Sequence, residues 1–130
     1  MPPIAFRAPL AGALLLAASP FIALPATAQT VAASKALSAA VAAPTRSPNN
    51  VPRDKYRHPA GALAFFGLKP TDTVVEIWPM GGWYTEILAP YLKSKGTLYA
   101  VDFWPDSLKG VQALQAKDAA LYGKIKLAAF

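Results

Sequence analysis

The sequence predicts an α/β domain with a doubly wound parallel sheet that is truncated after its third strand. Two runs of β-branched and aromatic residues, 73–78 and 97–102, read as strands, and a third strand begins at 124. Helical apolar patterns separate them, and strands alternating with helices favour right-handed parallel crossovers. We expect the first strand to be covered on both faces. The chain ends within the third predicted strand, so we expect the first strand to keep one edge unpaired.

Residues 1–28 have the layout of a secretory signal peptide. Arg7 precedes the apolar stretch Pro9–Leu24, and the triplet Ala26–Ala28 supplies the small residues of a cleavage site. We expect cleavage after Ala28 and a periplasmic or secreted protein. The alternative is a short membrane anchor, but the apolar run falls short of the roughly 20 residues that a spanning helix needs. The chain has no cysteine, which excludes a lipid-anchored form and any disulfide.

Residues 29–51 are expected to form a flexible leader, and residues 52–130 the folded domain. The leader is rich in Ala, Ser, Thr and Pro, so it offers no wide apolar face, and prolines interrupt its end. The net charge of +6 comes from basic residues spread along the chain. Nucleic-acid binding favours a denser basic face with stacking aromatics, so we expect no nucleic-acid partner.

The domain opens with a predicted helix over residues 59–66. Gly67 fits the left-handed position that follows such a helix, and Leu63 and Leu68 fall where a Schellman cap brings two apolar side chains together. A turn then leads into the first strand.

The second helix is predicted from Trp83 to a stop at Gly96, and the third begins at Pro105 and Asp106. Proline and a negative charge are both favoured in the first turn of a helix, and Gly123 separates this helix from the third strand. The second helix carries a clear apolar stripe. Its members are Tyr84, Ile87, Leu88, Tyr91 and Leu92.

Two acidic residues mark the candidate site. Glu76 lies near the end of the first strand, Asp102 closes the second, and the loop 79–82 precedes the second helix. Ligands of such sheets bind beyond the carboxyl ends of the strands. Asp102 follows Gly82 by about 20 residues, the spacing at which an acidic side chain accepts hydrogen bonds from ribose hydroxyls.

The loop composition bears on which nucleotide could bind. A dinucleotide loop places glycine at three positions that press against a pyrophosphate. Those positions are occupied here by Trp78, Met80 and Trp83, which argues against NAD. The Glu-x-Gly-x-Gly-x-Gly loop of S-adenosylmethionine enzymes meets a ligand without phosphates, and of its glycines only Gly82 is present.

Four segments carry a resemblance to a known family: Leu63–Pro70, Val74–Pro79, Gly81–Leu92 and Gly96–Asp102. Together they resemble the exported class I S-adenosylmethionine-dependent methyltransferase-like proteins of bacteria, over residues 53–130. The most distinctive piece is Gly-Gly-Trp-Tyr-Thr at 81–85. Met80 stands where the family usually has glycine, which would impair binding if the position needs a positive φ.

The resemblance implies a Rossmann-like methyltransferase fold and an S-adenosyl-L-methionine site. Glu76 would hold the amino end of the cofactor, Gly81 and Gly82 would line its passage, Asp102 would take the ribose, and Phe103 would pack near the adenine. The chain would hold only the cofactor-binding half and be inactive by itself. The acceptor and the catalytic residues would come from later strands.

Other interpretations stay open. Glu76 could cap the following helix, and Asp102 could serve as a strand-end residue or a helix N-cap. Trp78, Trp83 and Tyr84 are expected to be core residues rather than cofactor contacts. His58 is the only histidine, so we expect it on the surface and expect no metal site. The protein could also be a non-catalytic exported binding module or, less favoured, an NAD-linked oxidoreductase.

Overall fold

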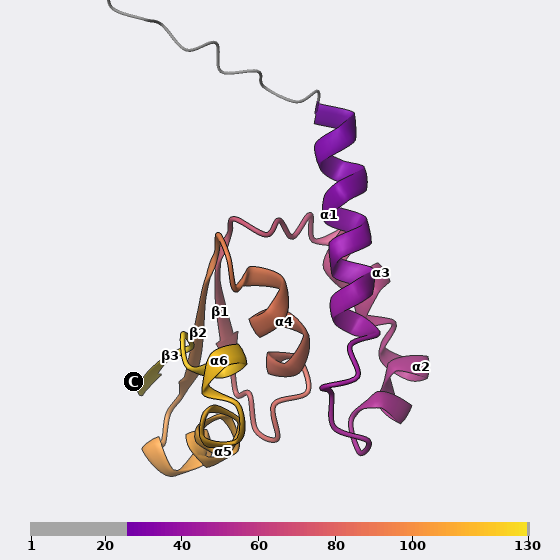
Figure 1. Cartoon of the computed structure of the whole chain (residues 1–130). Helices are drawn as coiled ribbons and strands as arrows, with labels where there is room; N and C mark the ends of the chain where they lie inside the picture. The colour runs from indigo at the N-terminus through magenta and orange to yellow at the C-terminus, as the bar shows by residue number, and fades with distance from the viewer. Residues whose placement is uncertain (1–25, 130) are drawn as a thin grey trace, which may run out of the picture.

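The computed structural model describes residues 26–129, so most of the predicted signal peptide lies outside the described residues. Three parallel strands form one sheet in the order β1-β2-β3, flanked by helices (Figure 1), which confirms the α/β class and the parallel sheet. The elements in chain order are α1 (Ala26–Val41), η1 (Val51–Arg53), α2 (Asp54–Arg57), α3 (Pro59–Phe65), β1 (Thr73–Ile77), α4 (Thr85–Leu92), β2 (Thr97–Asp102), η2 (Pro105–Leu108), α5 (Lys109–Lys117), α6 (Ala119–Tyr122) and β3 (Lys126–Ala129).

The central strand is β2. It pairs with β1 from Thr73 opposite Thr97 to Ile77 opposite Val101, and on its other side with β3. Within the described residues β1 pairs with β2 alone, so the expected unpaired edge is present.

The described helices lie on one side of the sheet, with α4 against it and α1 and α3 beyond (Figure 1). Ile87 of α4, Ala100 of β2 and Val111 of α5 are fully buried between these layers. On the opposite face Val75 is 55% exposed and Ile77 59%. The expectation that the first strand is covered on both faces was therefore wrong, because every described helix packs on the same face.

The cap after α3 forms as predicted. Gly67 has φ +70°, and its N–H donates to Ala64 O at 2.9 Å. The Leu68 N–H donates to Leu63 O at 3.1 Å, which completes a Schellman motif. Leu63 and Leu68 are both partly buried against the core.

The segment expected to be a flexible leader is structured in the part that the model describes. α1 covers 16 residues, and its Leu37 and Ala40 are buried against α3 and α4. Alanine has the highest helix propensity, and small side chains let two helices approach closely, so a segment without large apolar residues can still pack. None of the helices between residues 26 and 129 is long and apolar enough to cross a membrane.

Candidate functional site

The two acidic residues predicted for the site stand on the same face of the sheet. Glu76 is level with Ala100 of β2, and Asp102 lies two residues beyond Ala100 on the same strand. Side chains alternate between the two faces along a strand, so the side chain of Asp102 lies on the same face as that of Glu76. It is two residues nearer the carboxyl end of the sheet. The structure thus brings the two carboxyl groups to the end of the sheet where ligands of parallel sheets bind.

Glu76 is held by the start of α4. Its Oε2 accepts a hydrogen bond from Thr85 Oγ1 at 2.7 Å. Burial raises the pKa of Glu76 to about 7, and hydrogen bonds from Thr85 oppose that rise. Because Thr85 is the first residue of α4, the contact agrees with the helix-capping interpretation, and it leaves Glu76 without a cation among the described side chains.

Asp102 is more deeply buried than Glu76. It is 3% exposed, and no described side chain forms a hydrogen bond or an ion pair with its carboxylate. Its oxygens are not among the fully buried side-chain atoms without a hydrogen-bond partner, which in the described part of the chain are Arg46 Nε and the Tyr122 hydroxyl oxygen. Phe103 follows directly, half exposed, with its ring centroid 5.7 Å from that of Trp78.

The loop after β1 has an unusual backbone. Trp78, Met80 and Gly82 have φ values of +57°, +50° and +76°. The position that the resembled family fills with glycine therefore does need a positive φ, and methionine adopts it here at a steric cost. A Cβ at Gly81 would meet nothing within 4 Å, so this stretch of the loop is open to close approach.

The aromatic residues of this region divide between core and surface. Trp83 is buried, as expected, and Tyr84 is partly buried. Trp78 is mostly exposed, so its assignment to the core was wrong. The positive φ at Trp78 ends β1 one residue before the predicted boundary and turns the chain out of the sheet.

A contact behind the loop was not foreseen from the sequence. A Cβ at Gly110 in α5 would collide with Met80 O, and one at Gly82 would come within 2.7 Å of Leu114 Cδ1. Helix α5 thus passes directly against the loop, and glycine at 82 and 110 permits that approach. Gly110 sits inside a helical pattern, where an unexplained glycine is the available sequence signal.

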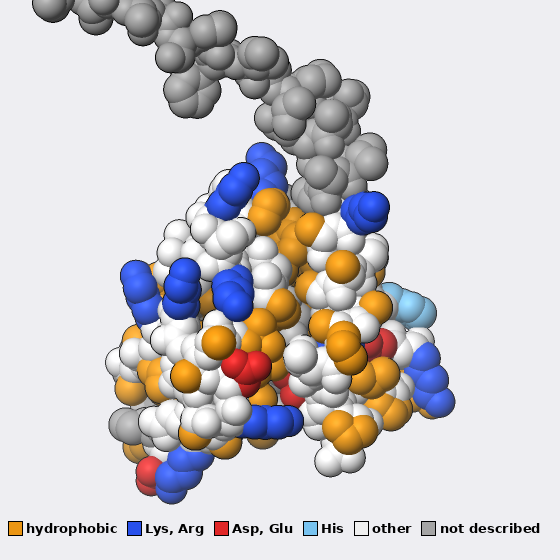
Figure 2. All heavy atoms as spheres, in the orientation of Figure 1, with side chains coloured by type: hydrophobic (Ala, Val, Ile, Leu, Met, Phe, Trp, Pro, Cys, Tyr) orange, Lys and Arg blue, Asp and Glu red, His pale blue; other side chains and the backbone are white. Residues whose placement is uncertain are grey.

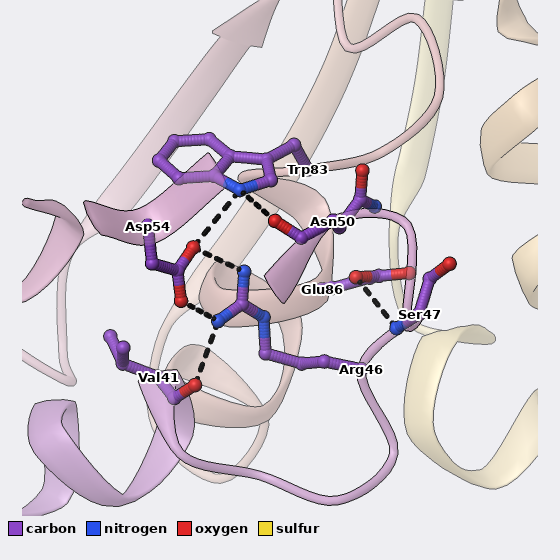
Figure 3. A network of polar contacts seen from close by, with 7 residues as sticks. All are labelled: Val41, Arg46, Ser47, Asn50, Asp54, Trp83 and Glu86. Atoms are coloured by element: carbon purple, nitrogen blue, oxygen red, sulfur yellow. Dashed lines mark hydrogen bonds and ion pairs between the residues drawn. The ribbon is translucent and has the colours of Figure 1, made fainter. Parts of the chain in front are cut away.

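A second group of polar residues lies where the leader meets α4 (Figure 3). The fully buried guanidinium of Arg46 forms a two-pronged ion pair with Asp54, with Nη2 at 2.9 Å from Oδ1, and Nη1 donates to Val41 O at 2.7 Å. Trp83 Nε1 donates to Asp54 Oδ1 at 3.1 Å and to Asn50 O at 3.0 Å. We call these five residues the Arg46 network.

Electrostatics in the Arg46 network differ from those at the strand ends. The hydrogen bond from Arg46 lowers the pKa of Asp54, and its positive charge lowers it further. Nearby, the buried Glu86 accepts a hydrogen bond from the Ser47 N–H at 3.1 Å, which adds a further tie between the leader and α4 (Figure 3). The network fastens the segment before the domain onto the domain itself.

No metal site accompanies these groups. Among residues 26–129, no cluster of three or more His, Cys, Asp or Glu side chains is placed to hold a metal ion. His58 is exposed, as expected.

Comparison of the chain with models of known protein families, with curated proteins and with solved structures finds no match.

Proposed function

We propose that the chain binds S-adenosyl-L-methionine at the carboxyl ends of β1 and β2, as the cofactor-binding half of a methyltransferase with a doubly wound, Rossmann-like sheet. One observation carries the proposal. Glu76 and Asp102 lie on the same face near the carboxyl ends of β1 and β2, and no described cation neutralises either of them. S-adenosylmethionine brings an ammonium group, a sulfonium and ribose hydroxyls, which are the groups that two such carboxylates attract.

Each predicted residue has a place in the proposed complex. The Asp102 carboxylate accepts hydrogen bonds from the ribose hydroxyls. Glu76 lies nearer the loop and receives the ammonium group, which favours the ionised form of this buried carboxyl. Gly81 and Gly82 line the passage between them, where the open space at Gly81 admits the ligand. Phe103 offers a partly exposed ring to the adenine.

The contribution of these residues to methyl transfer is positioning. Holding the methyl donor in line with a nucleophile removes much of the entropic part of the barrier. We assign no described residue to binding or deprotonating the methyl acceptor. The proposed activity therefore needs further groups that bind the acceptor and catalyse the transfer.

Met80 favours a second candidate, an exported binding module that takes no part in catalysis. Its positive φ carries a steric cost that glycine would avoid, at a loop that a cofactor must approach closely. An NAD-linked oxidoreductase is less favoured, because Trp78 and Met80 occupy loop positions that would press against a pyrophosphate.

Titration calorimetry with S-adenosylmethionine, S-adenosylhomocysteine and NAD separates these candidates. We expect the first two compounds to bind. Asp102→Ala should weaken their binding by about 1–3 kcal/mol, because the ribose hydroxyls lose a charged acceptor. Asp106→Ala is the matched control, since Asp106 is exposed and pairs only with Lys109 among the described residues. Unchanged affinity in Asp102→Ala would remove that residue from the site. Binding of NAD alone would favour the oxidoreductase, and no binding of any of the three would favour the module.

Export is part of the same proposal. Cleavage after Ala28 makes Gln29 the first residue of the mature protein, which mass spectrometry of the purified N-terminus detects. Recovery of intact Met1 from the membrane fraction would instead favour the anchor.

A further inference from the structure

Five exposed lysines gather at the amino ends of the strands, at the opposite end of the sheet from Glu76 and Asp102. They come from three connections: the turn before β1, the α4–β2 loop, and the start of β3. Because the strands are parallel, these segments lie together at the end of the sheet where the strands begin. The lysine face, as we call it, consists of Lys69, Lys93, Lys95, Lys124 and Lys126.

Negative charge is scarce on this face. In the three connections Asp72 is the one acidic residue among those described, and its carboxylate is engaged by the Lys69 N–H at 2.9 Å. On the visible face in Figure 2, Lys and Arg side chains lie over the upper part without Asp or Glu beside them, whereas lower down basic and acidic side chains lie together. Basic side chains occur at both ends of the molecule, but on the lysine face they have few acidic neighbours, so the positive potential there is less neutralised.

Apolar surface lies beside the lysines. The rings of Phe65, the last residue of α3, and Phe66, which follows it, are 86% and 78% exposed, and both precede Lys69 closely in the chain. A recess of about 280 Å³ also opens between Lys93, Lys124 and Lys126. Its apolar lining includes Leu92, Leu98, Leu121 and Ile125.

We propose that the lysine face docks the protein on the surface of an anionic phospholipid bilayer. Peripheral proteins bind such surfaces through cationic side chains together with apolar groups that enter the headgroup region. The first turn of α1 lies at the same end of the molecule (Figure 1), so this end of the helix also faces the bilayer. The carboxyl-end site then faces away from the lipid, where a dissolved ligand can reach it.

Co-sedimentation with vesicles tests the proposal. The protein recovered from cells that express the full chain is mixed with vesicles of phosphatidylcholine, or of phosphatidylcholine and phosphatidylglycerol in equal parts. We expect binding to the anionic vesicles alone, and less of it as salt is added. The triple substitution Lys93→Gln, Lys95→Gln, Lys124→Gln should lower the partition coefficient about a hundredfold, because each lysine near an anionic surface contributes roughly a factor of five.

A matched control removes the same charge elsewhere. Lys55→Gln, Lys109→Gln and Lys117→Gln change exposed lysines of α2 and α5, away from the lysine face (Figure 1), and should leave binding nearly unchanged. The triple substitution Lys93→Arg, Lys95→Arg, Lys124→Arg keeps the charge and should preserve binding, which guards against a loss caused by misfolding. Equal loss in the two glutamine triples, or no binding of the unmodified protein to anionic vesicles, would overturn the proposal. Binding to duplex DNA without binding to vesicles would also overturn it.

Discussion

Acidic groups have opposite environments in the Arg46 network and in the carboxyl-end site. In the network, Asp54 meets the buried guanidinium of Arg46 and the indole N–H of Trp83, and its pKa falls. At the strand ends, Glu76 meets a hydroxyl and its pKa rises, while Asp102 meets no described side-chain donor. A carboxylate that pairs with a cation inside the protein, such as Asp54, stabilises the folded state. An ionised carboxyl group that the fold leaves without a cation costs stability, and under the proposed function a bound ligand offsets that cost.

The largest expected effect is in the network. Arg46→Met keeps much of the side-chain volume but leaves Asp54 without its cation and Val41 O without its donor. We expect the free energy of unfolding to fall by about 2–4 kcal/mol, below the full range for a buried pair because Asp54 stays partly exposed. Urea unfolding measures it, with Arg53→Met as the control. A change as small as that of the control would show that the network does not hold the leader in place.

The next effect separates the two regions by pH. Glu76 has a pKa of about 7 in the folded protein against an ordinary value of 4.5, so the folded state binds the proton more tightly. The stability contributed by this group is full below pH 4.5 and is lost as the pH rises to about 7, by as much as about 3 kcal/mol. Glu76→Gln cannot ionise, so urea unfolding of this variant should not show that loss.

The pH dependence of stability that we expect from Asp54 has the opposite sign. Its pKa is lowered, so its contribution to stability is present above its ordinary pKa of 3.8 and is lost as the pH falls through that range. Arg46→Met should therefore reduce the loss of stability in acid and leave the Glu76 effect unchanged. A wild-type protein whose stability does not change between pH 4.5 and 7 would contradict the account of Glu76.

A smaller effect is expected at the loop of the carboxyl-end site. Met80→Gly relieves a positive φ, and the greater freedom of glycine in the unfolded chain offsets part of the gain. We expect the free energy of unfolding to rise by about 0.5–1 kcal/mol, with affinity for S-adenosylmethionine unchanged or higher. Trp78→Gly relieves a similar steric cost but also deletes the ring beside Phe103, so its free energy of unfolding should rise less. Weaker binding in Met80→Gly would give the methionine a direct role in binding.

The smallest effect concerns the outer side of the network. The Arg57 guanidinium lies 4.8 Å from the Trp83 ring centroid and that of Arg53 lies at 5.8 Å. Arg57→Gln should cost about 0.5–1 kcal/mol in thermal unfolding and Arg53→Gln less, because the attraction weakens with distance. Equal costs would indicate that the two arginines act only by covering the ring.

The carboxyl-end site was the more predictable of the two regions. Its residues sit at the ends of strands, and strand ends follow from local patterns of β-branched residues. β2 has the predicted bounds, and β1 stops one residue early because Trp78 adopts a positive φ. The sequence patterns could not show how many faces of the sheet the helices cover, because the exposure of Val75 and Ile77 depends on where the helices pack.

The Arg46 network had no local signature. Arg46 and Asp54 are separated by prolines in a segment with no helical or strand period, and Trp83 and Glu86 come much later in the chain. Only the tertiary fold brings them together. The same holds for α1, because an alanine-rich segment shows no apolar stripe from which packing could be inferred.

The start of α1 has a consequence for the timing of maturation. The described part of α1 includes Ala26–Ala28, where the predicted cut falls, and a protease generally takes its substrate as an extended strand. Under the proposed export, cleavage after Ala28 therefore comes before this stretch of helix forms or after it frays. Once cut, the chain begins with the ammonium group of Gln29 at a helix N-terminus, where the helix dipole disfavours positive charge. We expect the mature helix to shorten from this end back toward the point where Leu37 anchors it.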